Sequence, residues 1–310
     1  MESAQNLKRR IKSVQNIGQI TKAMELVAAT KMRRAQELAL TSRPYAYTAL
    51  ELLGILSELK DVPMPELLVA RPVIKTAFMI VTSDKGLAGS FNSAVIRRFE
   101  HFLRSEHIDP HNPQYAFVAV GQKAKSYLER RKLNVVGTFT RVGDYTKREE
   151  VEPISNFLIE GFLRHDFDSV VVFFTTFVTA LRQDAVAREF LPIGYEVIKQ
   201  SIEETIPRAG RYSQYARSES FLEEKEREYL IEPSPKEVLA ELAPELLRIR
   251  IYHAILEANA SEHSARRVAM KNASDNASEL SEDLNMEYNK SRQANITREI
   301  IEITSGTQAS

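Results

Sequence analysis

The stretch that decides the fold is RVAMKNASDNASELSEDLNMEYNKSRQANITREIIEITSG, residues 267–306. It lies in a longer segment, residues 245–305, that contains neither proline nor glycine, and Gly306 is its expected stop. A helix of this length measures roughly 90 Å, several times the reach of a compact domain. The capping box Ser234-Pro235-Lys236-Glu237 predicts that the helix starts at Pro235, and Pro244 is expected to bend or restart it.

Small residues recur along one stripe of this helix. Because small side chains let two helix axes approach closely, the stripe predicts contact with a second helix. The steps from Ala265 onward are mostly fours, which predicts that the two helices wind around each other only gently. The stripe consists of Ile251, Ile255, Ala258, Ala265, Ala269, Ala273, Ala277, Leu280, Leu284 and Tyr288.

The other end of the chain predicts a matching partner. Between residues 3 and 43 the only glycine is Gly18, and apolar residues recur in steps of three and four. The pattern continues through Pro44 to about Leu59, with a kink expected at the proline. The stripe consists of Leu7, Ile11, Val14, Ile17, Ile20, Met24, Val27, Ala35 and Leu38.

The middle of the chain has the pattern of an α/β domain. Residues 73–82 and 169–178 are β-branched and aromatic runs, as in strands buried on both faces of a sheet. Alternation of strands and helices predicts a mostly parallel sheet. Further strands are expected at residues 115–120, 133–136 and 189–198, and helices at residues 90–104, 122–131 and 146–163.

These elements predict a central Rossmann-like α/β domain and a long antiparallel coiled coil formed by the N- and C-terminal helices. The two helices are too long for the α/β domain to cover, so each must bury its stripe against the other. The expected divisions are residues 1–60 (first helix), 73–198 (α/β domain), 199–233 (charged linker or foot) and 234–310 (second helix).

Composition excludes several classes of function. The 310 residues carry 42 Lys+Arg and 42 Asp+Glu, so the chain lacks the positive field of a typical nucleic-acid binder. There is no cysteine, which excludes disulfides, thiolate metal sites and a cysteine nucleophile. The start MESAQNLKRR has no apolar signal region, and no apolar run is long enough to span a membrane. We therefore expect a soluble chain that meets a membrane only through partners.

No motif indicates catalysis or a cofactor. Residues 83–90, SDKGLAGS, follow a predicted strand as phosphate loops do, but they match neither GxGxxG nor GxxxxGK[ST], so a plain turn is favoured. His107 and His111 lie near Pro110 and Pro113, which rules out a helical metal-binding pair. We expect no active site, no metal and no cofactor in this chain.

Charge is distributed unevenly along the chain. Eight Lys/Arg against two Glu in residues 1–34 form either a solvated helix face or a surface for an acidic partner. Eight acids against three bases in residues 219–241 form either a solvated surface or a docking site for a basic partner.

The letters of four segments strongly resemble the gamma subunit of F-type ATP synthase, the central stalk of its F1 sector. They are SVQNIGQITKAMELVAATKMRRAQ at 13–36, TSDKGLAGSFN at 82–92, YLIEPSPKEVL at 229–239, and the 267–306 stretch. The resemblance implies a non-catalytic rotor shaft inside a ring of alpha and beta subunits. Proton flow would turn the shaft, which would drive ATP synthesis in the beta subunits and regulate their ATPase activity. It also implies contacts with the epsilon subunit and the ring of c subunits.

The resemblance also implies roles for individual residues. Met24 and Arg266 match a contact between the two shaft helices, and Arg292, Gln293 and Thr297 match residues that meet a loop of the ring. Ile300, Ile301 and Ile303 fit a shaft tip running in a hydrophobic collar. Tyr229 and Glu232 match the foot on the c ring.

Some positions depart from the family. Lys85 and Ala88 stand where Arg and Cys are frequent, and residues 199–227 match poorly. A chain without cysteine cannot use the redox switch of plastid members, and no transit sequence is recognised. Both observations favour a bacterial protein on the inner face of the plasma membrane.

Two other interpretations stay open at this point. The chain could be a coiled-coil adaptor whose α/β domain binds a ligand near residues 84–90, or an α/β enzyme. Tight, stoichiometric ATP binding by the isolated chain would favour the enzyme.

Overall fold

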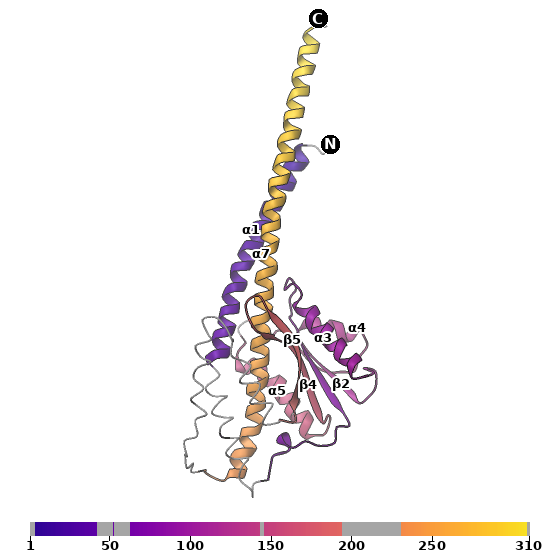
Figure 1. Ribbon diagram of the computed structural model, residues 1–310, viewed down its shortest axis with the longest axis vertical. Coiled ribbons are helices and arrows are strands. Elements are labelled where there is room, and N and C mark those ends of the chain that lie inside the picture. The colour runs from indigo at the N-terminus through magenta and orange to yellow at the C-terminus, as the bar shows by residue number, and fades with distance from the viewer. Residues whose placement is uncertain (1–3, 42–51, 53–62, 143–145, 194–230, 309–310) are drawn as a thin grey trace. The chain divides into compact units, whose positions relative to one another are not determined.

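The computed structural model describes residues 4–41, 52, 63–142, 146–193 and 231–308, which fall into two compact units (Figure 1). Unit 1 contains residues Met1–Ala29 and Arg266–Ser310, and unit 2 contains Thr30–Ala265. Two long helices, α1 (Ala4–Thr41) and α7 (Pro235–Gln308), contribute to both units. The four divisions expected from the sequence stay predictions.

Unit 2 is built on a five-stranded sheet in the order β3-β2-β1-β4-β5. Strand β1 pairs in parallel with β2 and β4, β2 pairs in parallel with β3, and β5 is antiparallel to β4. The strands are β1 (Thr76–Val81), β2 (Tyr115–Val120), β3 (Val135–Phe139), β4 (Ser169–Phe177) and β5 (Gln183–Leu191). The predicted α/β class is confirmed.

The last strand differs from the prediction of residues 189–198. Strand β5 begins at Gln183 and returns beside β4 through a tight turn, in which the backbone N–H groups of Thr179 and Arg182 each donate to the other residue's carbonyl (2.9 and 3.2 Å). The turn contains no glycine, so the sequence did not mark it as a hairpin turn. Most residues of β5 are half-buried and do not form a continuous apolar run, so the sequence did not mark the start of the strand either. Residues 194–198 lie outside the described residues.

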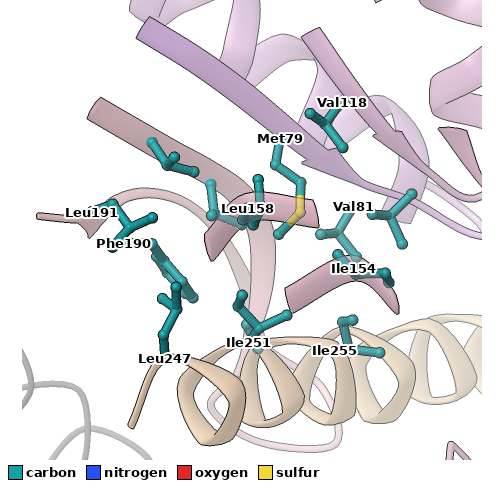
Figure 2. Close-up of a cluster of buried hydrophobic side chains, with 14 of the residues drawn as sticks. Met79, Val81, Val118, Ile154, Leu158, Phe190, Leu191, Leu247, Ile251 and Ile255 are labelled. Atoms are coloured by element: carbon teal, nitrogen blue, oxygen red, sulfur yellow. The ribbon is translucent and has the colours of Figure 1, made fainter. Parts of the chain in front are cut away.

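Each face of the sheet carries its own hydrophobic core. On one face, α3 (Phe91–Ser105) and α4 (Gln122–Arg130) cover an aromatic cluster in which the rings of Phe99 and Phe173 meet edge-on at 5.1 Å. The opposite face packs against α5 (Arg148–Leu163), the short 3-10 helix η1 (Glu66–Leu68) and the first part of α7. In Figure 2, Leu247, Ile251 and Ile255 of α7 point toward this core.

Helix α7 passes through both of its expected interruptions. Pro244 lies inside it, flanked by the buried Ala243 and Leu246, so packing offsets the hydrogen bond that proline cannot donate. The expected stop at Gly306 is wrong, because the helix ends at Gln308. The predicted continuation of the first helix to Leu59 falls outside the described residues, apart from Leu52.

A buried ion pair holds the chain at its entry into β1. Arg71 Nε donates to Asp168 Oδ1 at 2.8 Å, and its second amino nitrogen donates to the carbonyls of Phe162 and Phe167. The backbone N–H groups of Ile74 and Lys75 both donate to Asp168 Oδ2 at 3.0 Å. Burial alone would raise the pKa of Asp168, but these hydrogen bonds and the Arg71 charge outweigh it and hold that pKa below its usual value.

We expect Asp168→Asn to lower the free energy of unfolding by about 3 kcal/mol, because it leaves Arg71 buried without its counter-charge. The control Asp166→Asn, at an exposed pair with Arg164, should change it by less than about 0.5 kcal/mol. Urea unfolding of the purified chains measures both.

Since the folded pKa of Asp168 is depressed, the contribution of Asp168 to the free energy of unfolding should be complete above about pH 4 and shrink as the pH falls further. A difference between the natural chain and Asp168→Asn that grows with acidification would contradict this.

Candidate functional site

The loop after β1, at the carboxyl edge of the sheet, is where an α/β domain would hold a phosphate. Here the loop hydrogen-bonds to the start of α4, the helix that follows the neighbouring strand β2. The N–H groups of the first turn of α4 are bonded by the loop, with Gln122 N donating to Asp84 Oδ1 at 2.9 Å and Ala124 N to Thr82 Oγ1 at 2.7 Å. Lys123 N donates to the carbonyl of Ser83 at 3.2 Å. The first-turn amides of α4 are therefore already occupied and are not available to a phosphate.

Gly121 explains why this loop can lie so close to α4. Its φ is +89°, and a Cβ at this position would sit 2.1 Å from the carbonyl oxygen of Thr82, so only glycine fits. The second carboxylate oxygen of Asp84 accepts from Arg141 N at 2.8 Å. Thr82, Ser83 and Asp84 thus form hydrogen bonds with neighbouring backbone N–H groups, which agrees with the interpretation of this motif as a plain turn. Within the described part of the chain, no three His, Asp or Glu side chains gather as they would around a metal ion.

We expect Asp84→Ala to lower the free energy of unfolding by about 1 kcal/mol, because it removes the acceptor for two backbone N–H groups. Lys85→Ala, at the neighbouring exposed position, is the matched control and should be nearly neutral. Urea unfolding compares the two variants. Equal stability of the two variants would show that the hydrogen bonds accepted by Asp84 do not contribute to the free energy of unfolding.

In unit 1, α1 and α7 pack antiparallel. Leu7 and Ile11, near the start of α1, cluster with Leu284, whereas Gly18 lies beside Ala277. The approach at Gly18 is close, since a Cβ there would sit 3.4 Å from the Ala277 Cβ. The predicted antiparallel helix pair is therefore confirmed in this unit.

The buried seam matches the predicted stripe only in part. On α1, Leu7, Ile11 and Val14 belong to both. Ile17, Ile20 and Val27 are exposed, and beyond Val14 the seam uses small and polar residues in steps of four and three. The whole seam of α1 runs through Leu7, Ile11, Val14, Gly18, Thr21, Glu25 and Ala28. The seam of α7 has the same spacing and runs through Met270, Ser274, Ala277, Ser281, Leu284, Tyr288 and Ser291.

The four-residue steps and gentle winding predicted from Ala265 onward are therefore wrong. A seam with a mean step of 3.5 residues is the repeat of a left-handed coiled coil. Leu280, taken as part of the stripe, is 44% exposed, because the small Ala277 and Ser281 occupy the contact. Hydrophobicity misplaced part of the seam, because many large apolar residues of this unit lie outside it.

Large apolar side chains are instead exposed on the outer faces of both helices. Those on α1 are 51–60% exposed, and three of them, Ile20, Leu26 and Val27, are at most seven positions apart in the chain. Soluble surfaces seldom place this many large aliphatic groups together unless they bind a partner. They are Ile17, Ile20, Leu26 and Val27 on α1 and Leu280, Met286, Ile296, Ile300 and Ile301 on α7.

The residues expected to contact partners lie in several environments. Met24 is half-buried on α1 and Arg266 is buried on α7, while the contact expected between them stays a prediction. Arg292, Gln293 and Thr297 are exposed, and Thr297 Oγ1 donates to the carbonyl of Gln293 at 2.9 Å.

The expected tip and foot residues are only partly described. Ile300 and Ile301 are 55% and 59% exposed. Ile303 lies within α7, but its side chain is outside the described residues, as is the whole of Tyr229. Glu232 is exposed.

Sequence analysis missed Arg250, a buried cation on α7. It donates to the carbonyls of Glu189 (2.5 Å) and Phe190 (3.3 Å), where β5 carries one extra residue relative to β4, and its guanidinium lies 4.2 Å from the Phe190 ring. Burial, together with the charge of Arg188, lowers the pKa of Arg250 to about 9. The sequence could have indicated that Arg250 is buried, because it lies next to Ile251 and four residues before Ala254.

We expect Gly18→Ala to strengthen the helix pair, because alanine adds about 1 kcal/mol of helix propensity and its Cβ makes an ordinary contact with Ala277. Gly18→Leu should weaken the pair, because a larger side chain has no room at the crossing. Hydrogen exchange of the amides of residues 7–28 measures both effects. Equal protection in the two variants would contradict the close crossing.

The fold and the exposed helix faces define a class of protein: one that combines an antiparallel helical coiled coil with an α/β domain. Comparison with known proteins identifies the family. A profile described as ATP synthase matches residues 3–309. The ATP synthase gamma chain of Roseiflexus castenholzii is 40% identical over 100% of this chain and 99% of its own length. The gamma chain of Moorella thermoacetica is 37% identical, with the same coverage.

Solved structures agree on the fold. A chain of the Euglena gracilis mitochondrial ATP synthase, from an assembly of OSCP, F1 and c-ring, aligns with a TM-score of 0.64 at 19% identity, covering 99% of this chain and 94% of that one. A chain of the Tetrahymena thermophila central stalk and c-ring aligns with a TM-score of 0.56 at 21% identity, covering 82% and 99%. The chain belongs to the ATP synthase gamma-chain family. None of the helices that the structure describes is long and apolar enough to cross a membrane.

Proposed function

We propose that this chain is the rotor shaft of an F-type ATP synthase and carries no catalytic site of its own. The observation that carries the proposal is the pair of exposed apolar helix faces in unit 1, whose own seam is made largely of small and polar residues. Such a pair needs surrounding protein to cover its aliphatic side chains. The gamma chains to which it is similar are subunits of an ATP synthase.

The shaft would act by biasing conformations of its neighbours. The outer surface of the helix pair is asymmetric, because apolar residues such as Ile20 and Leu26 share it with exposed bases such as Lys8 and Arg10. Each orientation of the shaft would therefore offer different contacts to three otherwise equivalent beta subunits. A ligand shifts a conformational equilibrium only through such differential contacts. Rotation driven by proton flow would then change nucleotide affinity in each beta subunit in turn, so the shaft regulates ATP turnover without performing it.

The α/β domain supports the non-catalytic part of the proposal. The first-turn amides of α4 already donate to Thr82, Ser83 and Asp84 of the chain itself. The adaptor interpretation places a ligand near residues 84–90, where both carboxylate oxygens of Asp84 are already engaged by backbone N–H groups. We propose alpha, beta, epsilon and c-ring subunits as partners, and a peripheral position on the cytoplasmic side of a bacterial membrane, reached through the membrane sector.

The first test is native mass spectrometry of this chain co-expressed with the alpha and beta subunits of its own genome. We expect a complex with three alpha, three beta and one copy of this chain. A chain that stays free while alpha and beta assemble with each other would overturn the proposal.

The second test concerns the exposed end of α7. Ile300→Asp with Ile301→Asp should weaken seating of the helix end in an apolar collar and reduce ATP-driven proton pumping at least several-fold, because it buries charge. The control is Asn289→Asp with Asn295→Asp, which adds two charges at exposed polar positions of the same helix. Pumping in inverted membrane vesicles measures coupling. Equal pumping by both double variants would count against a seated tip.

A further inference from the structure

In unit 2, helix α7 makes polar contacts on both sides of its apolar stripe. The stripe, which includes Leu247, Ile251 and Ile255, points into the core of the sheet (Figure 2). An α-helix advances by roughly 100° per residue, so positions 3, 4, 7 or 11 apart share a side, whereas positions two apart lie on nearly opposite sides. The polar contacts follow this spacing in two rows. We call Arg250, Ser261 and Ser264 the hairpin row, and Arg248, Tyr252 and Asn259 the α5 row.

The hairpin row joins α7 to the hairpin formed by β4 and β5. Arg250 donates to the carbonyl of Glu189 at 2.5 Å, and Ser264 donates to the carbonyl of Ala180 at 2.6 Å. Between them, Ser261 donates to a carbonyl of β4 at 3.4 Å. All three side chains are buried, and the outer two bonds lie roughly 20 Å apart along the helix. Because these acceptors are backbone carbonyls, they cannot follow a moving helix by changing rotamer.

The α5 row joins the other side of α7 to α5 and to the residue just ahead of it. Arg248 donates to Asn156 Oδ1 at 3.3 Å. The hydroxyl of Tyr252 donates to the carbonyl of Thr146 at 3.2 Å, and the amide of Asn259 donates to the hydroxyl of the same threonine at 2.5 Å. The apolar stripe is therefore flanked by hydrogen bonds to two different elements of the domain.

Hydrogen bonds on both sides oppose rotation of α7 about its own axis. With a helix radius of roughly 5 to 6 Å, a rotation of about 10° moves the side-chain ends by about 1 Å. That displacement is enough to break hydrogen bonds, which are lost beyond roughly 3.5 Å. A rotation in either sense displaces both rows from their acceptors. Apolar packing is non-directional, so the stripe alone would resist a small rotation less.

We propose that the hairpin row and the α5 row are the contacts through which torque passes between the α/β domain and α7. The proposal rests on the proposed function, because only a turning shaft loads these contacts. Turning a two-helix shaft about its long axis also turns each helix about its own axis. Since α7 runs unbroken from Pro235 to Gln308, fixing its angle in unit 2 also fixes the twist delivered to its part of unit 1. The residues of both rows are thus positioning residues and take no part in the chemistry.

The test measures the torsional stiffness of the shaft in the complex of this chain with cysteine-free alpha and beta subunits, held at rest without nucleotide. The natural chain has no cysteine, so Glu129→Cys, on the exposed surface of α4, gives one attachment site for a gold nanorod on the α/β domain. The angular variance of the nanorod is inversely proportional to the torsional stiffness, because each degree of freedom carries the same thermal energy.

We expect Arg250→Met with Ser264→Ala, which removes most of the hairpin row, to widen the angular variance at least twofold. Tyr252→Phe with Asn259→Ala, in the α5 row, should widen it at least 1.5-fold. The matched control is Asp84→Ala, which removes hydrogen bonds of the same domain that do not involve α7 and should leave the variance unchanged.

Equal variance in the natural chain and the hairpin-row variant would overturn the proposal. Equal widening by Asp84→Ala would overturn it too, because the stability of the domain would then set the stiffness. Ser264→Ala alone removes a single oxygen atom and keeps the test open if the double variant does not fold; it should widen the variance at least 1.2-fold. If the natural chain fails to enter the ring, native mass spectrometry detects this separately, and it is the proposed function that fails.

Discussion

One helix, α7, has to satisfy two different packing partners along its length, and the rest of the structure depends on this constraint. Its first part presents a broad apolar face, including Leu247, Ile251 and Ile255, to the core of the sheet domain. Its later part presents a narrow seam to α1, with the small Ala277 at the crossing beside Gly18. A broad face anchors a helix through buried area. A narrow seam sets register and spacing and leaves most of the helix surface available for other contacts.

The α/β domain uses its polar residues to hold backbone in place rather than to perform chemistry. Asp84 and Thr82 bond the first turn of α4, Asp168 fixes the entry to β1, and Arg250 fixes the irregularity near the end of β5. In each case a charged or hydroxyl group makes hydrogen bonds with backbone N–H or carbonyl groups of a neighbouring segment. This accounts for conspicuous polar motifs in a domain for which we propose no active site.

Two physical causes account for the main errors of the sequence analysis. Hydrophobicity marks every face that avoids water, including faces that wait for another protein. On α1, Ile17, Ile20 and Val27 were therefore assigned to the seam, although the structure exposes them and buries Thr21 and Glu25 instead. Separately, β5 escaped notice because its half-buried residues carry no continuous apolar run, and its pairing with β4 is a tertiary fact.

The sequence by itself determined that the chain has two long terminal helices and a central α/β domain, because helix periodicity, proline and glycine placement and buried strand composition are local properties. It also contained the family resemblance. Only the tertiary structure decided which face of each helix is the seam, that β5 is antiparallel, that Asp84 bonds the start of α4, and that Arg71 and Asp168 fix the segment leading into β1. These features depend on residues up to 256 positions apart in the chain, and the geometry that joins them exists only after folding.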